Sequence, residues 1–147
     1  MRTDRQAPRP LGSRAAALST TVSELHVTRD NLNADLFVRL CDVDLRGRSR
    51  NVCDGIVRLT GADPLTGTVR VSLIGAAYRF GCGHRLRVQV AGGAHPRFAR
   101  NPGNGQVDAP AKDFAVTRYS IGLGGPSPSA LVLSAVSQTA GKAAAHA

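Results

Sequence analysis

The feature that most limits the possible folds is a strict two-residue alternation of apolar and polar side chains. It is clearest in Val69-Arg70-Val71-Ser72-Leu73 and again in Leu86-Arg87-Val88-Gln89-Val90. Successive side chains of a β-strand point to opposite faces, so this period predicts half-buried strands with Arg70, Ser72, Arg87 and Gln89 directed outward. No segment has a sustained helical period.

Further strands are expected between turn-forming clusters. The candidates are residues 22–28, 35–43, 55–60, 114–121 and 130–136, in addition to 68–74 and 85–91. The separating turns are 45–50, 61–67, 92–95, 101–105 and 122–129. Several short strands with turns between them predict an all-β, antiparallel sandwich or barrel. Its expected core consists of Val38, Leu40, Val57, Leu59, Val69, Val71, Leu73, Leu86, Val88 and Val90.

The 147 residues allow one domain. We assign residues 1–20 and 137–147 to disordered tails, because they lack periodicity, and residues 21–136 to the domain. No stretch approaches the ~18–20 apolar residues of a membrane span, and residues 1–20 lack the apolar core of a secretory signal. We therefore expect a cytoplasmic protein without a membrane partner.

The formal charge of +9 raises the question of nucleic-acid binding. The arginines are scattered through every segment, form no run and are not interleaved with aromatic residues. Since the basic patch typical of nucleic-acid readers is missing, we expect no nucleic-acid partner.

Motifs for catalysis and cofactor binding are missing. The segment 47–51 comes closest to a G-x-S-x-G nucleophile elbow, but its last residue is Asn51, and Ser49 falls in a turn between strands rather than between a strand and a helix. There is no phosphate-binding G-x-x-x-x-G-K-[ST] and no H-E-x-x-H. We expect no catalytic residue and no cofactor in this chain.

A metal site built on Cys82 and His84 would need two more ligands. Cys41, Cys53, His26 and His95 are available, but none has the spacing typical of a zinc site. We therefore expect no metal.

A disulfide between Cys41 and Cys53 would have to join two strands across a hairpin. If Leu40 and Leu59 face inward, alternation turns Cys41 outward and Cys53 inward, and cross-strand partners must share a face. A β-bulge near Asp42 could still bring the two thiols together.

Three stretches, read together, carry a family resemblance. They are residues 35–59 (DLFVRLCDV through GRSRNVCDGIVRL), residues 78–90 (YRFGCGHRLRVQV) and residues 95–103 (HPRFARNPG), with an echo of a closing P-S-x-L-x-L at residues 128–133. In order and spacing, this resembles the C-terminal domain of the Xaa-Pro dipeptidyl-peptidase and cocaine-esterase hydrolases, over roughly residues 22–136.

The resemblance implies a jelly-roll, galactose-binding-like β-sandwich that accompanies a serine hydrolase. Its parent enzyme would carry the Ser-Asp-His triad in a preceding α/β-hydrolase domain that is absent from this chain, so that no catalytic residue carries over. The family's sandwich also starts earlier, with a strand expected before Ser23, and has a Trp where this chain reads Leu73-Ile74-Gly75-Ala76-Ala77. We therefore expect a sandwich without its first strand, dependent on a hydrolase partner.

The motif residues are expected to serve structure. Phe80 would anchor the edge of the core, Gly81 and Gly83 would allow tight turns, and Asp54-Gly55 would form a turn before a strand. His84 and Arg85 would hydrogen-bond loop carbonyls. A buried Asp42 needs a partner, for which Arg39, Arg85 and Arg87 are candidates.

The leading prediction of function is a non-catalytic accessory domain that packs on a hydrolase. The alternative is an independent module that binds a carbohydrate or another small ligand. Sugar sites usually offer an exposed Trp or Tyr, and this chain has no Trp and only Tyr78 and Tyr119.

Overall fold

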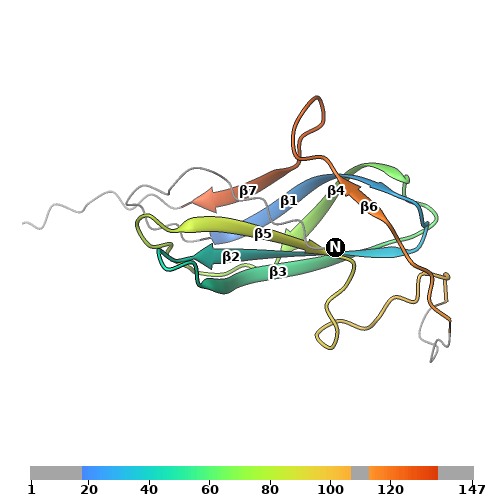
Figure 1. Cartoon of the computed structure of the whole chain (residues 1–147), viewed down its shortest axis with the longest axis horizontal. Coiled ribbons are helices and arrows are strands. Elements are labelled where there is room, and N and C mark those ends of the chain that lie inside the picture. The colour runs from blue at the N-terminus through green and yellow to red at the C-terminus, as the bar shows by residue number, and fades with distance from the viewer. Residues whose placement is uncertain (1–17, 107–112, 136–147) are drawn as a thin grey trace, which may run out of the picture.

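The computed structural model describes residues 18–106 and 113–135, and within them two antiparallel β-sheets and no helix (Figure 1). The strands are β1 (Leu18–Arg29), β2 (Ala34–Val43), β3 (Ser49–Leu59), β4 (Thr66–Leu73), β5 (Arg85–Ala91), β6 (Tyr119–Ile121) and β7 (Ala130–Ala135). The all-β, sandwich prediction is therefore confirmed. No helix that could cross a membrane occurs in the part of the chain that the structure describes.

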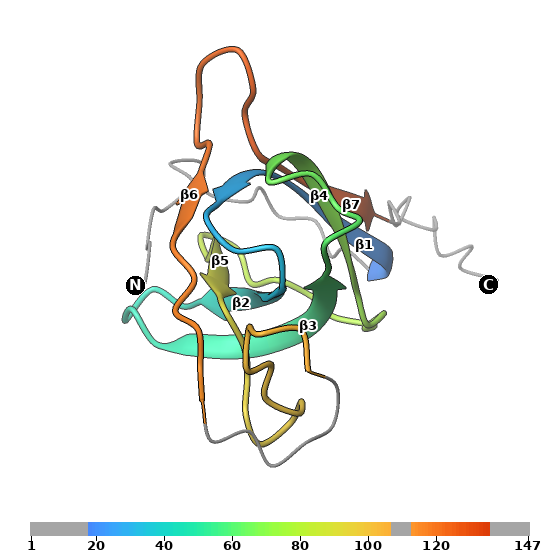
Figure 2. The same cartoon turned by 90° about the vertical axis from the view of Figure 1, so that its right-hand side faces the viewer.

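Each sheet is built around one central strand. In the first sheet, β1 pairs with β4 along one edge and with β7 and then β6 along the other. In the second sheet, the order is β3-β2-β5, and β2 and β3 form a long hairpin. Figure 2, a view along the sandwich, shows the two sheets as two layers. The buried core cluster is formed by side chains from both sheets.

The alternation seen in the sequence sets the inward and outward faces. Val38, Leu40, Leu59, Val71 and Leu73 are buried, and the side chains of Val57, Val69, Leu86, Val88 and Val90 are half-buried against them. Arg70 faces outward with 75% of its side chain exposed, and it pairs with Glu24 on β1 at 2.9 Å. Arg87 and Gln89 lie on the outer face as predicted but are half-buried rather than exposed.

Three predicted boundaries differ from the structure. Strand β1 begins at Leu18, three residues inside the segment assigned to the N-terminal tail, because Leu18 pairs with Ala135 of β7. Strand β3 begins at Ser49 rather than at residue 55, and only Tyr119–Ile121 of the segment 114–121 is a strand. The rest of both predicted tails, residues 1–17 and 137–147, lies outside the described residues.

Strands β3 and β4 approach each other closely at Gly55, along one long side of the sandwich. The prediction that Gly55 belongs to a turn is wrong. It lies inside β3, where a Cβ atom would come within 2.1 Å of the carbonyl oxygen of Ser72 on β4. The backbone N–H of Ile74, just beyond β4, donates to the carbonyl oxygen of Asp54 at 2.9 Å. The two sheets therefore meet backbone to backbone along β3 and β4, at a distance that only glycine permits.

The cysteines of the long hairpin lie on opposite faces. Leu40 is opposite Cys53 and Cys41 is opposite Asn51, so that Val52 is the extra residue of a β-bulge. Cys53 belongs to the core cluster, whereas the Sγ of Cys41 lies 3.8 Å from Oε1 of Gln89 on β5. Both thiols are buried and free, and burial raises the pKa of Cys53. A bulge is thus present in the hairpin, but it does not bring the two thiols to one face.

Candidate functional site: the two ends of the sandwich

A buried arginine ties together the turns at one end of the sandwich. Arg29, at the end of β1, has only 3% of its surface exposed. Its Nη1 donates to the carbonyl oxygens of Asn31, at 2.7 Å, and Leu32, and its Nη2 donates to those of Thr60 and Asp63 at 3.2 and 2.9 Å. A guanidinium offers five donors in a fixed plane, so this one side chain holds the β1–β2 turn against the β3–β4 loop. We call this part of the molecule the loop end.

A second buried polar group holds the loop after β5 at the same end. The carboxylate of Asp35 accepts two bonds from Arg58, at 2.9 and 3.2 Å, and a third from Nδ2 of Asn101 at 2.9 Å. Tyr119 donates its hydroxyl proton to the carbonyl oxygen of Asp35 at 2.8 Å. The N–H of Gly103, which has φ of +78°, donates to Oδ1 of Asn101. The first and third resembling stretches therefore meet at Asp35 and Asn101, a pairing that sequence reasoning missed.

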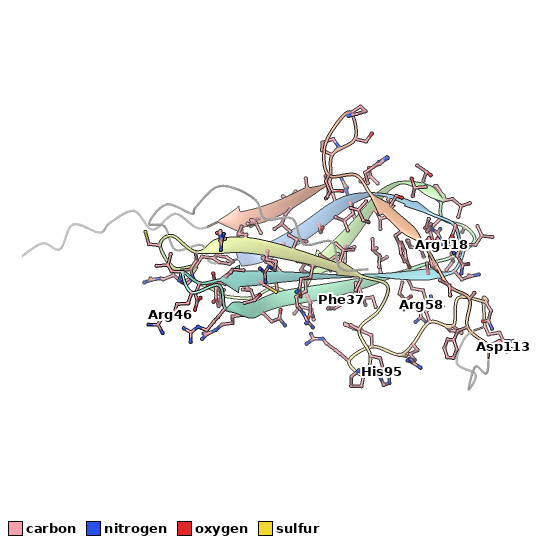
Figure 3. All side chains as sticks on the ribbon, viewed as in Figure 1. Phe37, Arg46, Arg58, His95, Asp113 and Arg118 are labelled. Carbon is pink, nitrogen blue, oxygen red and sulfur yellow. The ribbon has the colours of Figure 1, made fainter. Side chains whose placement is uncertain are left out.

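Apolar side chains are exposed at the loop end. They are Leu32 (48% exposed), Leu65 (42%), Phe114 (54%) and Val116 (78%). Backbone hydrogen bonds from Asp30 N–H to the Arg118 carbonyl and from Ala115 N–H to the Pro102 carbonyl join the segments that carry them. Figure 3 shows Asp113, Arg118 and Arg58 at this end and Arg46 at the opposite one. Large contiguous apolar patches are typical of a surface that another protein covers. Other segments of the described chain also expose apolar side chains, namely Leu45, Ile74, Leu123 and Val132.

A hollow of about 410 Å³ lies beside this apolar surface. It is lined by Gly92, Gly93, Ala94, His95, Ala99, Arg100, Asn101 and Phe114. The guanidinium of Arg100 lies 5.5 Å from the ring centroid of Phe114. The side chains of Arg100, Phe114 and His95, all on the loop between β5 and β6, thus line the hollow.

The opposite end of the sandwich, the hairpin end, carries a carboxylate, a histidine and a tyrosine in contact. Both carboxylate oxygens of buried Asp42 lie 2.9 Å from Nδ1 of His84, and Tyr78 donates its hydroxyl proton to Oδ2 at 2.9 Å. Burial, and then this hydrogen bond to Asp42, raise the pKa of Tyr78. A phenol and an imidazole ring thus contact Asp42, and Arg39, one of its three predicted arginine partners, pairs with Asp54 instead.

Gly81 makes room for this histidine. A Cβ at Gly81 would lie 2.6 Å from Nε2 of His84, and the backbone N–H of His84 donates to the Gly81 carbonyl at 3.1 Å. The predicted contact of His84 with a loop carbonyl is thus made by its backbone, while its ring contacts Asp42. The second resembling stretch therefore fastens the β4–β5 loop to β2, and Phe80 beside it is buried as predicted.

The outer face of the β3-β2-β5 sheet is partly covered by the loop after β5. Asp54, which is 1% exposed, lies 2.9 Å from Nη2 of Arg97 and 3.6 Å from Nη2 of Arg39. The rings of Phe37 and Phe98 lie 6.1 Å apart, and the guanidinium of Arg39 lies 5.1 Å from the Phe37 centroid. In the sequence, Asp54 and Arg97 belong to different motifs, and the sheet brings them together.

Six arginines form ion pairs with carboxylates in the described residues. Carboxylates lie within ion-pair distance of Arg39, Arg48, Arg58, Arg70, Arg97 and Arg118. These six arginines are distributed over both sheets and both ends, and each lies beside an acidic side chain.

The candidate nucleophile and candidate metal ligands named from the sequence all lie within residues 18–106 and 113–135. Ser49 is exposed at the start of β3, and no hydrogen bond joins a described serine, threonine or cysteine side chain to His84. No three His, Cys, Asp or Glu side chains of these residues gather so that they could hold a metal ion.

Comparison with known proteins gives one consistent family. The family described as X-Pro dipeptidyl-peptidase C-terminal non-catalytic domain matches residues 20–132. Cocaine esterase from Rhodococcus sp. (strain MB1 Bresler) is 30% identical over 100 residues, which is 61% of this chain but only 17% of the esterase.

Solved structures show the same fold within larger proteins. An aminopeptidase from the marine sediment archaeon Thaumarchaeota archaeon has a TM-score of 0.72 and 22% identity over 88% of this chain and 25% of its own. An α-amino acid ester hydrolase has a TM-score of 0.70 and 21% identity over 87% and 24%. A CocE/NonD family hydrolase from Staphylococcus aureus has a TM-score of 0.61 and 17% identity over 92% and 30%. This chain therefore spans less than a third of each relative.

Proposed function

The chain belongs to the family of X-Pro dipeptidyl-peptidase C-terminal non-catalytic domains, and we propose that it is the accessory β-sandwich of a serine hydrolase. In this proposal it packs on an α/β-hydrolase domain that lies outside residues 18–135. That hydrolase domain carries the nucleophile and its base. The sandwich would be of the jelly-roll, galactose-binding-like type, and the protein would be cytoplasmic.

One observation carries the proposal: the match covers most of this chain but a small part of each relative. The chain corresponds to 17% of cocaine esterase and to 24% of the α-amino acid ester hydrolase. A non-catalytic domain of this size in a larger hydrolase contributes through the surface on which it packs. The functional feature of this chain is therefore an interface rather than a pocket.

The loop end is the surface we expect the hydrolase domain to cover. Leu32, Leu65, Phe114 and Val116 are each between 42% and 78% exposed. Full burial of such a side chain contributes roughly 1.5–3 kcal/mol, so covering four that are half-exposed contributes about 4 kcal/mol. Because Arg29 and Asn101 already fix the loops, little further ordering opposes the docking.

The direct test is reconstitution with an α/β-hydrolase polypeptide, and the proposal requires that the same gene or its neighbour encode one. We expect the two to co-elute in gel filtration, and we expect substitution of Phe114→Ser with Val116→Ser to weaken their association by about tenfold or more. Leu45→Ser is the matched control, because Leu45 is 79% exposed at the hairpin end. Separate elution of the unmodified proteins would contradict the proposal, and equal effects of both variants would contradict the choice of surface.

The second test is activity. We expect the purified chain to hydrolyse neither an aryl ester nor an aminoacyl-proline anilide, and the reconstituted pair to hydrolyse at least one of them. Turnover by the chain alone would contradict a non-catalytic role, whether or not it survives Ser49→Ala.

A small-ligand-binding module is the second candidate, and the hollow beside Phe114 is the observation that favours it. Its volume of about 410 Å³ falls in the range of ligand pockets, ~300–1,000 Å³. A sugar platform is less well supported, because the hydroxyls of Tyr78 and Tyr119 are engaged by Asp42 and Asp35. Stabilisation of the isolated chain by one sugar from a panel, abolished by Phe114→Ser, would favour this candidate over the first.

A further inference from the structure

The hairpin end holds most of the net positive charge of the described residues. These residues contain thirteen arginines, no lysine and eight Asp or Glu side chains, which leaves five net positive charges with histidine taken as neutral. Two carboxylates, Asp42 and Asp44, lie at this end. Six arginines accompany them on the hairpin, on the β4–β5 loop and on the part of β5 that pairs with residues 41–43, namely Arg46, Arg48, Arg50, Arg79, Arg85 and Arg87. The hairpin end therefore carries four of the five net charges, although the sequence has no run of arginines.

Asp44 holds the tip of the hairpin in one conformation. Its Oδ1 accepts hydrogen bonds from the backbone N–H groups of Arg46 and Arg48, both at 2.9 Å, and its carbonyl accepts one from the N–H of Gly47. The β4–β5 loop lies beside the tip, since a Cβ at Gly83 would come within 3.1 Å of Cδ2 of Leu45. The turn thus presents Leu45, which is 79% exposed, and Arg46 at the extremity of the molecule (Figure 3).

Three of these arginines meet no carboxylate among the described residues. Arg46, Arg50 and Arg79 are exposed, and no described Asp or Glu lies within ion-pair distance of them. Arg48 differs, because its Nε lies 2.7 Å from Oδ2 of Asp44. The two arginines on β5 are half-buried and have partners, so they add positive charge to this end without offering free contacts.

The chain itself offers no acidic surface that could cover this end. The rest of the described residues carry seven arginines and six carboxylates, so a second copy presents no net negative charge to it. Residues 1–17, 107–112 and 136–147 contain two acidic residues, Asp4 and Asp108, against four arginines and two lysines. The molecule that complements the hairpin end must therefore be a different one, and it must be anionic.

We propose that the hairpin end binds the surface of an anionic phospholipid bilayer, with Leu45 among the headgroups and Arg46, Arg50 and Arg79 on their phosphates. Arginine pairs with phosphate through two parallel N–H bonds. Each basic side chain close to an anionic membrane strengthens binding by about fivefold. Such binding lies in the plane of the headgroups and needs no spanning segment. It goes beyond the proposed function, which places the hydrolase domain on the opposite end.

The exposed leucine is the feature that favours a lipid surface over a nucleic acid. A nucleic-acid backbone would pair with the same arginines but would give the side chain of Leu45 no apolar environment to enter. Unpaired bases also need exposed aromatic rings on which to stack. The aromatic residues described at this end are Tyr78, which is half-buried, and Phe80, which is buried.

The test is co-sedimentation of the full chain with lipid vesicles. The probe is a vesicle of phosphatidylglycerol and phosphatidylcholine in equal parts, and the control is a vesicle of phosphatidylcholine alone. We expect the chain to bind the anionic vesicle only, and we expect added salt to release it, because salt screens exposed charges. Duplex DNA at the same phosphate concentration serves as a competitor, and we expect it to leave most of the chain on the vesicles.

Two double variants locate the contact. Arg46→Gln with Arg79→Gln removes two charges from the hairpin end, and we expect vesicle binding to weaken by about 25-fold. Arg70→Gln with Arg118→Gln also removes two charges, from side chains that are 75% and 84% exposed on other parts of the surface. We expect this second variant to weaken binding by less than about threefold, because distant charges are screened. The four arginines of residues 1–17 are present in both variants and so do not contribute to the difference.

Leu45→Ser separates the lipid contact from the hydrolase contact. We expect it to weaken vesicle binding by about fivefold, because less apolar surface leaves water, and to leave association with the hydrolase polypeptide unchanged. Phe114→Ser with Val116→Ser should have the reverse effects. The comparison of the two vesicles and the release by salt use the unmodified chain, so they do not depend on how well any variant folds.

Several results would overturn the inference. They are equal binding to both kinds of vesicle, no binding to either, or equal losses in the two double variants. Complete displacement by duplex DNA would make a nucleic acid the partner instead. None of these results bears on the hydrolase contact, and separate elution of the chain and the hydrolase polypeptide would leave vesicle binding as it is.

Discussion

Replacing Gly55 with alanine places a Cβ atom 2.1 Å from the carbonyl oxygen of Ser72, 3.0 Å from its carbonyl carbon and 3.2 Å from the Cα of Leu73. All three atoms are backbone, so no side-chain rotation can relieve the overlap. Strands β3 and β4 must separate along the side where the sandwich is closed. The hydrogen bond from Ile74 to the Asp54 carbonyl lengthens or breaks as they do.

The size of the effect follows from three contributions. Overpacking at a site without slack costs about 1–3 kcal/mol, and loss of the Ile74 hydrogen bond costs about 1 kcal/mol. Removing a glycine from the unfolded chain offsets about 0.4–1 kcal/mol of this. We expect Gly55→Ala to lower the free energy of unfolding by about 2–3 kcal/mol, which for a domain of this size lowers the melting temperature by roughly 8 °C.

Urea denaturation followed by far-ultraviolet circular dichroism measures this difference. Gly61→Ala is the matched control, because a Cβ there meets nothing within 4 Å and no positive φ is required. We expect Gly61→Ala to leave stability within about 0.5 kcal/mol of the unmodified chain. A Gly55→Ala variant as stable as the Gly61 variant would refute the account of how β3 and β4 close the sandwich.

Three further predictions concern individual side chains. Burial raises the pKa of both Tyr78 and Tyr119, so absorbance at 295 nm should titrate at higher pH in the folded chain than in urea. The stability that these tyrosines contribute is present below their ordinary pKa near 10 and is lost as the pH rises through their pKa values in the folded chain. Coincident titrations of the folded and unfolded chain would contradict this. A chromogenic disulfide reagent should label exposed Cys82 rapidly and Cys53 slowly, because the Cys53 thiol is buried and its pKa is raised. Cys82→Ser should remove the fast phase of labelling, and a fast phase that persists would contradict the assignment to Cys82. Arg29→Met should destabilise the chain by about 2 kcal/mol, because it removes the donor that several backbone carbonyls share, and Arg29→Lys should be intermediate. Urea melts that place Met above Lys in stability would contradict the role of Arg29 in joining the two turns.

The period of two was enough to predict most of the strands and the faces they present. In Val69–Leu73 the alternation alone places Val71 and Leu73 inside and Arg70 outside, because a one-residue shift would reverse every side chain. The order and spacing of the motifs likewise indicated the family, and the match to residues 20–132 confirms it. What failed were boundaries and roles that depend on neighbours distant in sequence.

The pair Asp54-Gly55 shows why a role that depends on distant neighbours could not be predicted. In the sequence the pair is typical of a turn, and nothing local reveals that β4 passes within contact distance of it. The same is true of Asp42, whose partners were sought among arginines although Tyr78 and His84, 36 and 42 residues away, occupy the space around it. The sequence by itself determined which faces are apolar, because that information is local and repeats every two residues. Only the tertiary structure decided which buried carboxylate meets which donor and where β3 and β4 approach closely enough to require Gly55, because both depend on how two sheets pack in space.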